Sequence, residues 1–199
     1  MISKQKPSPL RFAVLQAYSH AAEKPQDEHP FPLGLEFATS LGYPQSLLAG
    51  LPSVSVSAFA GVSNVSVFAD IPQGATVLDL GCGAGLDSLI AVKRVGETGL
   101  VIGIDFSEAM LRRARQGAAE IGADNVEFYQ ADADNLPVED GQIDVALVNG
   151  IFNLNPEREA IFNELARVVR PGGVVYAAEL ILREPLPPEV KQSEANWFA

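Results

Sequence analysis

Cysteine is nearly absent from this sequence, and so are long apolar runs. The one cysteine, Cys82, can form no disulfide within the chain and cannot build a cysteine-based zinc site, so we expect no metal. No uninterrupted stretch of about 18 apolar residues occurs, and no apolar run of signal-peptide length follows Lys4, Lys6 and Arg11. These absences predict a cytoplasmic, soluble protein with no membrane partner.

Basic residues are also scarce relative to acidic ones. The chain has 14 Lys and Arg against 25 Asp and Glu, which gives a formal net charge of -11. Binding of nucleic acid without sequence preference needs positive charge to displace counterions from phosphates. The sequence therefore disfavours nucleic acid as a partner, while 199 residues with 47% hydrophobic residues fit one globular domain with a sizeable core.

Proline divides the chain into two parts of different texture. Seven prolines lie within residues 1–70 and break this part into short pieces, so we expect an N-terminal cap or lid there. Within it, the pattern favours helices over residues 12–20 and 44–51 and a loop over residues 23–32. Residues 71–199 have a regular rhythm and are predicted to form the core.

Strand and helix patterns alternate through this core. β-branched and aliphatic runs predict strands over residues 76–80, 100–104, 126–129, 143–148 and 173–182. Apolar periodicity predicts helices over residues 86–95, 107–121 and 156–169, the second with Ser107 as its N-cap. This alternation predicts an α/β fold, a doubly wound, mostly parallel sheet with helices on both faces.

A glycine-rich loop joins the first predicted strand to its helix. After Asp79 the chain must turn sharply, and Gly81, Gly83 and Gly85 remove side chains that would block a ligand. Free backbone N–H groups and the positive end of the helix favour an anionic group, either a phosphate or a carboxylate. A glycine loop alone is weak evidence for a cofactor, because such loops also make plain tight turns.

A carboxylate follows the next strand. Asp105 comes about 20 residues after the last glycine, where it can accept hydrogen bonds from both ribose hydroxyls of an adenosine, although it also fits a helix N-terminal acid. NAD uses the same pair of features. A dinucleotide fingerprint, however, puts its third glycine where Leu86 stands, whereas Gly85 suits a shorter ligand tail.

Four elements in this order resemble the class I S-adenosylmethionine-dependent methyltransferases. They are Asp79 before a Gly-x-Gly-x-Gly loop, Asp105, the segment at residues 131–137, and the Arg-Pro-Gly-Gly turn at residues 170–173. The resemblance implies a Rossmann-like fold, S-adenosylmethionine as the cofactor, and methyl transfer to a small molecule. Because the sulfonium already activates the methyl group, the protein needs chiefly to position the acceptor, and we assign no catalytic residue.

The resemblance also implies cofactor contacts. Along the cofactor they are Asp79, Gly81, Cys82, Gly83 and Gly85 at the methionyl end, Asn149 and Gly150 near the amino group or the methyl, Asp105 at the ribose, and Phe106, Met110, Asp132 and Ala133 at the adenine. Ordinary structural roles are the alternative, since Asp132 fits a turn, Met110 a core position and Asn149 a cap. The two histidines, His20 and His29, have no ligand or triad spacing and favour surface roles.

Residues 59–64 and 149–154 resemble the arsenite methyltransferase branch of this family, over a stretch that begins near Gly42. That resemblance places Ser63 and Asn64 near the methionyl end. Members of the branch hold the metalloid with several thiolates, whereas this chain has one cysteine.

The family continues past the fifth strand with a helix and two more strands, and this sequence has no such elements. The strand at residues 173–182 is then expected to present an unpaired apolar edge. Either the chain is a fragment, or a homodimer covers this strand, with Trp197 and Phe198 as a further apolar patch. The alternatives to a methyltransferase are a cofactor-binding or interaction protein without turnover, and a dinucleotide-binding oxidoreductase module.

Overall fold

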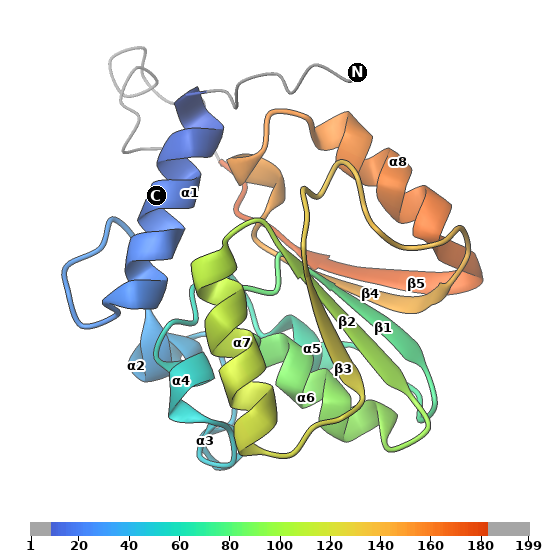
Figure 1. Cartoon of the computed structure of the whole chain (residues 1–199), viewed down its shortest axis with the longest axis horizontal. Coiled ribbons are helices and arrows are strands. Elements are labelled where there is room, and N and C mark those ends of the chain that lie inside the picture. Colours follow the sequence, from blue (N-terminus) through green and yellow to red (C-terminus); the bar gives the residue numbers. More distant parts are fainter. Residues whose placement is uncertain (1–8, 183–199) are drawn as a thin grey trace.

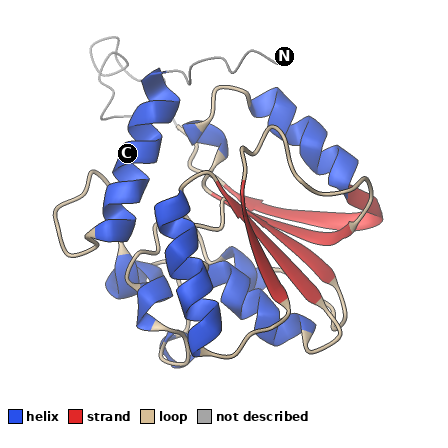
Figure 2. Ribbon diagram, in the orientation of Figure 1, coloured by secondary structure: helices blue, strands red, loops and turns tan. Residues whose placement is uncertain are grey.

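A single sheet of five parallel strands organises the protein, with helices on both of its faces (Figures 1 and 2). The structure is a computed structural model that describes residues 9–182. The strands follow the order β3-β2-β1-β4-β5. Their bounds are β1 Thr76–Leu80, β2 Leu100–Asp105, β3 Val126–Gln130, β4 Ile143–Asn149 and β5 Val169–Ala178. The predicted Rossmann-like α/β fold is confirmed.

Helices follow β1, β2 and β4, whereas the segment between β3 and β4 has none, and five helices of the described residues precede β1. The N-terminal ones are α1 Pro9–Glu23, α2 Gly34–Ser40, α3 Gln45–Leu48, α4 Ser53–Val56 and α5 Val65–Phe68. The core carries α6 Leu86–Val95, α7 Glu108–Glu120, the short 3-10 helix η1 Phe152–Leu154 and α8 Arg158–Val168. The predicted N-cap of α7 is confirmed, since the Ser107 hydroxyl accepts a hydrogen bond from the Met110 N–H at 3.3 Å.

Successive residues of β1 face opposite sides of the sheet, and each side has its own apolar cluster. Val77 is buried with residues of α5 and α6, whereas Leu78 is buried with residues of β2, β4 and α8. Burial on both faces is why the strands read as continuous apolar runs. β1 and its neighbour β4 therefore form a rigid centre, and their carboxyl ends lie at one edge of the sheet.

Of the N-terminal helices, α1 and α4 lie over this edge and are anchored by α7, whereas α5 packs on a face of the sheet with α6. The Arg113 guanidinium of α7 donates hydrogen bonds to the Ala22 carbonyl at the end of α1, to the Val54 carbonyl in α4 at 2.7 Å, and to the Ser57 hydroxyl at 3.1 Å. One cation thereby satisfies acceptors from two separate parts of the N-terminal region.

The last predicted strand differs from the observed one. The sequence predicts a strand over residues 173–182, but β5 spans Val169–Ala178, because its pairing with β4 begins at Ile143 and stops at Asn149. Among the described residues β5 pairs only with β4, and Val174 and Val175 are 45% and 40% exposed. The cover expected from a second copy remains a prediction, and Trp197 and Phe198 lie outside the described residues. No helix between residues 9 and 182 is long and apolar enough to cross a membrane.

Candidate functional site

A cavity lies at the carboxyl edge of the sheet, where β1, β2 and β4 end. It encloses about 1040 Å³, part of which is open to solvent. β1 pairs with β2 on one side and β4 on the other, so the strand order reverses direction here. Open α/β sheets bind their ligands in the crevice at such a switch point.

Eleven of the twelve residues that the family resemblance assigns to cofactor contacts line this cavity. They are Asp79, Gly81, Cys82, Gly83, Asp105, Phe106, Met110, Asp132, Ala133, Asn149 and Gly150. The twelfth, Gly85, instead caps α6 with φ at +85°, and a Cβ there would lie 2.9 Å from the Ala114 Cβ. Gly85 thus allows α6 and α7 to approach, and the contacts of the other eleven with a cofactor stay predictions.

Four of the five N–H groups of residues 81–85 are already bound, which corrects the expectation that the loop's N–H groups are free. Gly81 and Cys82 both donate to the Ile104 carbonyl, at 2.8 and 2.9 Å, and Gly83 donates to an Asp105 carboxylate oxygen at 2.8 Å. Gly85 donates to the Cys82 carbonyl at 2.9 Å. An anion placed on this loop would compete for donors that the protein uses itself.

Asp105 joins the glycine loop to the start of α7. One of its carboxylate oxygens accepts from the Gly83 N–H and the other from the Ser107 N–H, both at 2.8 Å. Burial raises the pKa of Asp105 to about 6, although these backbone hydrogen bonds oppose the rise. Each oxygen keeps a further lone pair for a ligand hydroxyl.

A second buried carboxylate, Asp87 in the first turn of α6, also lines the cavity. It accepts hydrogen bonds from the Tyr43 hydroxyl at 2.6 Å, from the Ser66 hydroxyl, and from the Asn149 side-chain amide at 2.9 Å. Sequence reasoning missed Asp87. Its signal was an acidic residue two positions after the last loop glycine, in the first turn of a predicted helix.

Asp79 completes what we call the acid cluster, namely Asp79, Asp87, Tyr43, Ser66 and Asn149. Among the described residues the Asp79 carboxyl accepts hydrogen bonds from Ser88 alone, through its hydroxyl at 2.5 Å and its backbone N–H. Burial, and after it the negative charge of Asp87, raise the pKa of Asp79 to about 8. The two carboxyls form no ion pair with any basic side chain of residues 9–182.

Asn149 ties β4 to the N-terminal region. Its side-chain carbonyl accepts from the Val62 and Ser63 N–H groups at 2.9 and 3.1 Å, and its amide donates to the Ser63 carbonyl at 2.8 Å. These bonds join residues 59–64 to residues 149–154, the two segments that carry the resemblance to the arsenite methyltransferase branch. Ser63 and Asn64 themselves do not line the cavity, and the Asn64 amide instead donates to the Gly42 carbonyl at 3.1 Å.

Helix α1 supplies a wall of the cavity that the sequence did not predict. Arg11, Val14 and Tyr18 share one helical face and line the cavity. Arg11 forms an ion pair with Asp132 and a second one with Asp134 at 3.4 Å. His20 and His29 lie outside the lining, which agrees with the surface roles that the sequence favours.

A buried hydroxyl in the same lining has no partner. Ser55 in α4 is fully buried, and its oxygen has no hydrogen-bond partner among the described residues. Buried hydroxyls are normally paired, so an unpaired one in a cavity wall suggests that a ligand or a water completes it.

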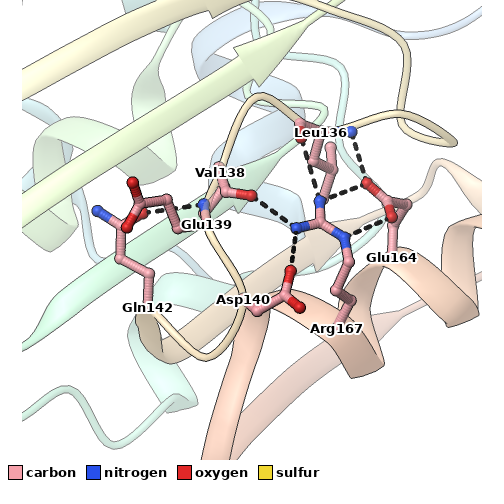
Figure 3. Close-up of polar contacts among 7 residues, drawn as sticks. All are labelled: Leu136, Val138, Glu139, Asp140, Gln142, Glu164 and Arg167. Carbon is pink, nitrogen blue, oxygen red and sulfur yellow. Dashed lines mark hydrogen bonds and ion pairs between the residues drawn. The ribbon is translucent and has the colours of Figure 1, made fainter.

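A second network of polar side chains binds the loop between β3 and β4, which carries Asp132. We call this network the arginine cluster (Figure 3). Its members are Arg167, Glu164 and Asp140, together with the backbone of Leu136 and Val138. Arg167 bonds both Glu164 carboxylate oxygens at 2.7 Å and donates to the Leu136 and Val138 carbonyls at 3.1 and 2.7 Å. The Leu136 N–H donates to Glu164 at 2.7 Å, so the loop is anchored through its backbone.

The known proteins that this chain resembles are named as methyltransferases. A family model described as a methyltransferase domain matches residues 71–198. An arsenite methyltransferase of Halobacterium salinarum is 40% identical over 131 residues, which cover 66% of this chain and 34% of that protein. A demethylmenaquinone methyltransferase of Lactococcus lactis is 37% identical over 125 residues, which cover 63% of this chain and 49% of that protein.

A solved structure matches nearly the whole chain. The arsenic(III) S-adenosylmethionine methyltransferase of Chlamydomonas reinhardtii has a TM-score of 0.63 and 25% identity, over 98% of this chain and 58% of that one. The curated relatives above are two to three times longer than the segment they share with this chain, since it covers 34% of one and 49% of the other.

Proposed function

This chain belongs to the methyltransferase domain family, and we propose that it binds S-adenosylmethionine and transfers the methyl group to a small organic molecule. The family model, the names of the relatives and the cavity at the switch point of the sheet support this proposal together. The activity and the substrate are proposals, because the shared segment is only part of the relatives.

The charge of the cavity is the observation that carries the proposal. Asp79, Asp87 and Asp105 are buried in its lining, and the lining's one basic residue, Arg11, is paired with Asp132. Buried carboxyls without counter-ions favour a ligand that brings positive charge. S-adenosylmethionine brings an ammonium and a sulfonium, whereas NAD brings a negatively charged pyrophosphate to a loop in which four of five N–H groups are occupied.

The residues of the cavity fit the parts of this cofactor. We assign the methionyl end to Asp79 and the glycine loop, the ribose to Asp105, and the adenine to the space between Phe106 and Met110 with Asp132 at its edge. The cofactor supplies an activated methyl group, so the chain's own task is to orient the acceptor and to exclude water. The α1 face with Val14 and Tyr18 serves the second purpose.

The state of Cys82 argues for an organic acceptor. Its thiol is buried in the loop, and burial raises its pKa well above the ordinary value, with the negative charges of Asp105 and Asp79 adding to the rise. A thiolate is the form that binds soft metal and metalloid ions. The one cysteine of this chain is therefore a poor ligand for arsenite.

Thermal unfolding with S-adenosylhomocysteine tests the cofactor. If this ligand binds only the folded state, a concentration of 100 dissociation constants should stabilise the protein by about 2.7 kcal/mol and raise its melting temperature. NAD at the same concentration should leave the melting temperature unchanged. A shift with NAD alone would instead favour the dinucleotide-binding module.

A pair of variants locates the binding. Asp105→Asn removes the charge at the proposed ribose site, and we expect the shift with S-adenosylhomocysteine to fall to a small fraction of its wild-type size. Asp124→Asn is the matched control, because Asp124 is exposed in the turn between α7 and β3. Equal shifts for both variants would place the ligand elsewhere. Methylated product from pooled small-molecule extracts would then separate an enzyme from a binding protein.

A further inference from the structure

The acid cluster holds two carboxyls that have very different hydrogen-bond partners. Asp87 faces the Tyr43 hydroxyl, the Ser66 hydroxyl and the Asn149 amide. The side-chain carbonyl of Asn149 accepts two N–H groups from the N-terminal region, and this fixes the orientation of the side chain so that its NH₂ group points to Asp87. Asp87 is thus surrounded by donors. Burial raises its pKa, and these three hydrogen bonds oppose the rise, so the carboxylate is the form that this environment accommodates.

Asp79 has the opposite environment. Its partners belong to one residue, Ser88, whose backbone N–H donates and whose hydroxyl can accept a proton from a carboxylic acid as readily as it donates to a carboxylate. If Asp79 were ionised, it would be a second charge in an enclosed space beside Asp87, with Asp105 nearby and no cation bound to it. Two buried carboxyls that interact in this way share one proton, and here the proton belongs on Asp79.

We propose that Asp79 is protonated in the ligand-free protein, and that it releases this proton to solvent when the methionyl ammonium of the cofactor binds beside it. When the cofactor binds, its ammonium group enters the acid cluster and the proton of Asp79 leaves it, so the net charge of the cluster with its ligand stays the same. The inference rests on the proposed function, since it needs a ligand with an ammonium group at the glycine loop.

The groups that face this pair come from each element packed around it. They are Ser88 of α6, Asp105 of β2, Asn149 of β4, Ser66 of α5, and Cys82 and Tyr43 from the flanking loops. The nearby cation, Arg94 of α6, donates to the Ser66 carbonyl and not to either carboxyl. A ligand ammonium is therefore the first positive charge to enter the cluster.

Calorimetry of S-adenosylhomocysteine binding measures the exchange directly. Titrations at pH 7 in phosphate and in Tris, which differ in ionisation enthalpy, should give different heats that correspond to about one proton released per ligand bound. The affinity should rise by up to tenfold per pH unit between pH 6 and pH 8. Equal heats in the two buffers would overturn the inference, and no binding at all would overturn the proposed function with it.

Two controls test which group gives up the proton. 5′-Methylthioadenosine has the same nucleoside but no amino acid part, so its binding should release no proton. Asp79→Asn resembles the protonated acid in shape and charge, and it should bind S-adenosylhomocysteine more weakly with no proton release, while Asp124→Asn behaves as the wild type. Proton release that persists in Asp79→Asn, or that is equally large with 5′-methylthioadenosine, would show the assignment to be wrong.

Discussion

The acid cluster and the arginine cluster are two polar networks in one protein, and they differ in charge balance. In the arginine cluster the Arg167 guanidinium meets Glu164 and Asp140, and its remaining N–H groups meet backbone carbonyls (Figure 3). In the acid cluster two carboxyls meet only neutral donors, which are hydroxyls, an amide and a backbone N–H. The first network is complete without a ligand, and the second lacks a cation.

This difference teaches that the two networks have opposite effects on folding. Hydrogen bonds from Arg167 hold the pKa of Glu164 below its usual value, so folding favours the ionised form. Burial holds the pKa of Asp79 above its usual value, so folding favours the neutral form. The arginine cluster therefore stabilises the fold, while the acid cluster stores an unfavourable interaction that a ligand can relieve.

The largest effect is expected from Asp79→Asn. This substitution removes the unfavourable interaction of the acid cluster, so the ligand-free protein should become more stable at neutral pH. The folded pKa of about 8 exceeds the unfolded value of 3.8, so the wild type loses stability as pH rises through this interval. The loss is about 1.4 kcal/mol per pH unit for one such group. Urea unfolding of both proteins at pH 5, 6 and 7 measures it.

The expected result is an advantage of Asp79→Asn that grows by roughly 3 kcal/mol from pH 5 to pH 7. Asp124→Asn again serves as the surface control and should follow the wild type at every pH. Parallel stability curves for wild type and Asp79→Asn would mean that Asp79 is ionised in the folded protein already.

Arg167→Leu should have a smaller effect of the opposite sign. It leaves the Glu164 carboxylate without its cation and frees the loop backbone at Leu136 and Val138, and we expect a loss of about 2 kcal/mol at pH 7. The side chain is 31% exposed, so solvent screens part of the interaction. Because the Glu164 pKa is lowered by folding, the loss should shrink as pH falls below about 4.

Unfolding of Arg167→Leu at pH 7 and pH 3.5 checks this sign. Arg167→Lys is the matched variant, since it keeps the charge but cannot bond both Glu164 oxygens and two carbonyls, and it should lie between the other two. A loss that is the same at both pH values would show that Arg167 acts through its hydrogen bonds to backbone carbonyls and its packing, and that the charge of Glu164 contributes nothing.

The sequence could predict the parts of the site that depend on local patterns, but not those that depend on tertiary contacts. β1, β4 and the glycine loop follow from local patterns, and strand order puts Asp79, Asp105 and Asn149 at one edge. The partners of Asp87 could not be predicted, because Tyr43 and Ser66 come from a proline-broken region with no periodic signal. Arg11 and Tyr18 were missed for a similar reason, since whether α1 covers the cavity depends on tertiary contacts such as those of Arg113.

Tyr43→Phe gives the smallest change and tests how firmly Asp87 is held as a carboxylate. The ring stays against Phe59, but Asp87 loses one of its three donors, so we expect a loss of about 1 kcal/mol and a melting temperature lower by roughly 3 °C. Tyr129→Phe is the matched control, because the exposed Tyr129 hydroxyl also donates to a carboxylate, Glu127, but on the surface. It should change nothing measurable. Equal effects of the two substitutions would mean that burial adds nothing to this hydrogen bond, and the proposed division of charge between Asp87 and Asp79 would then lose its structural basis.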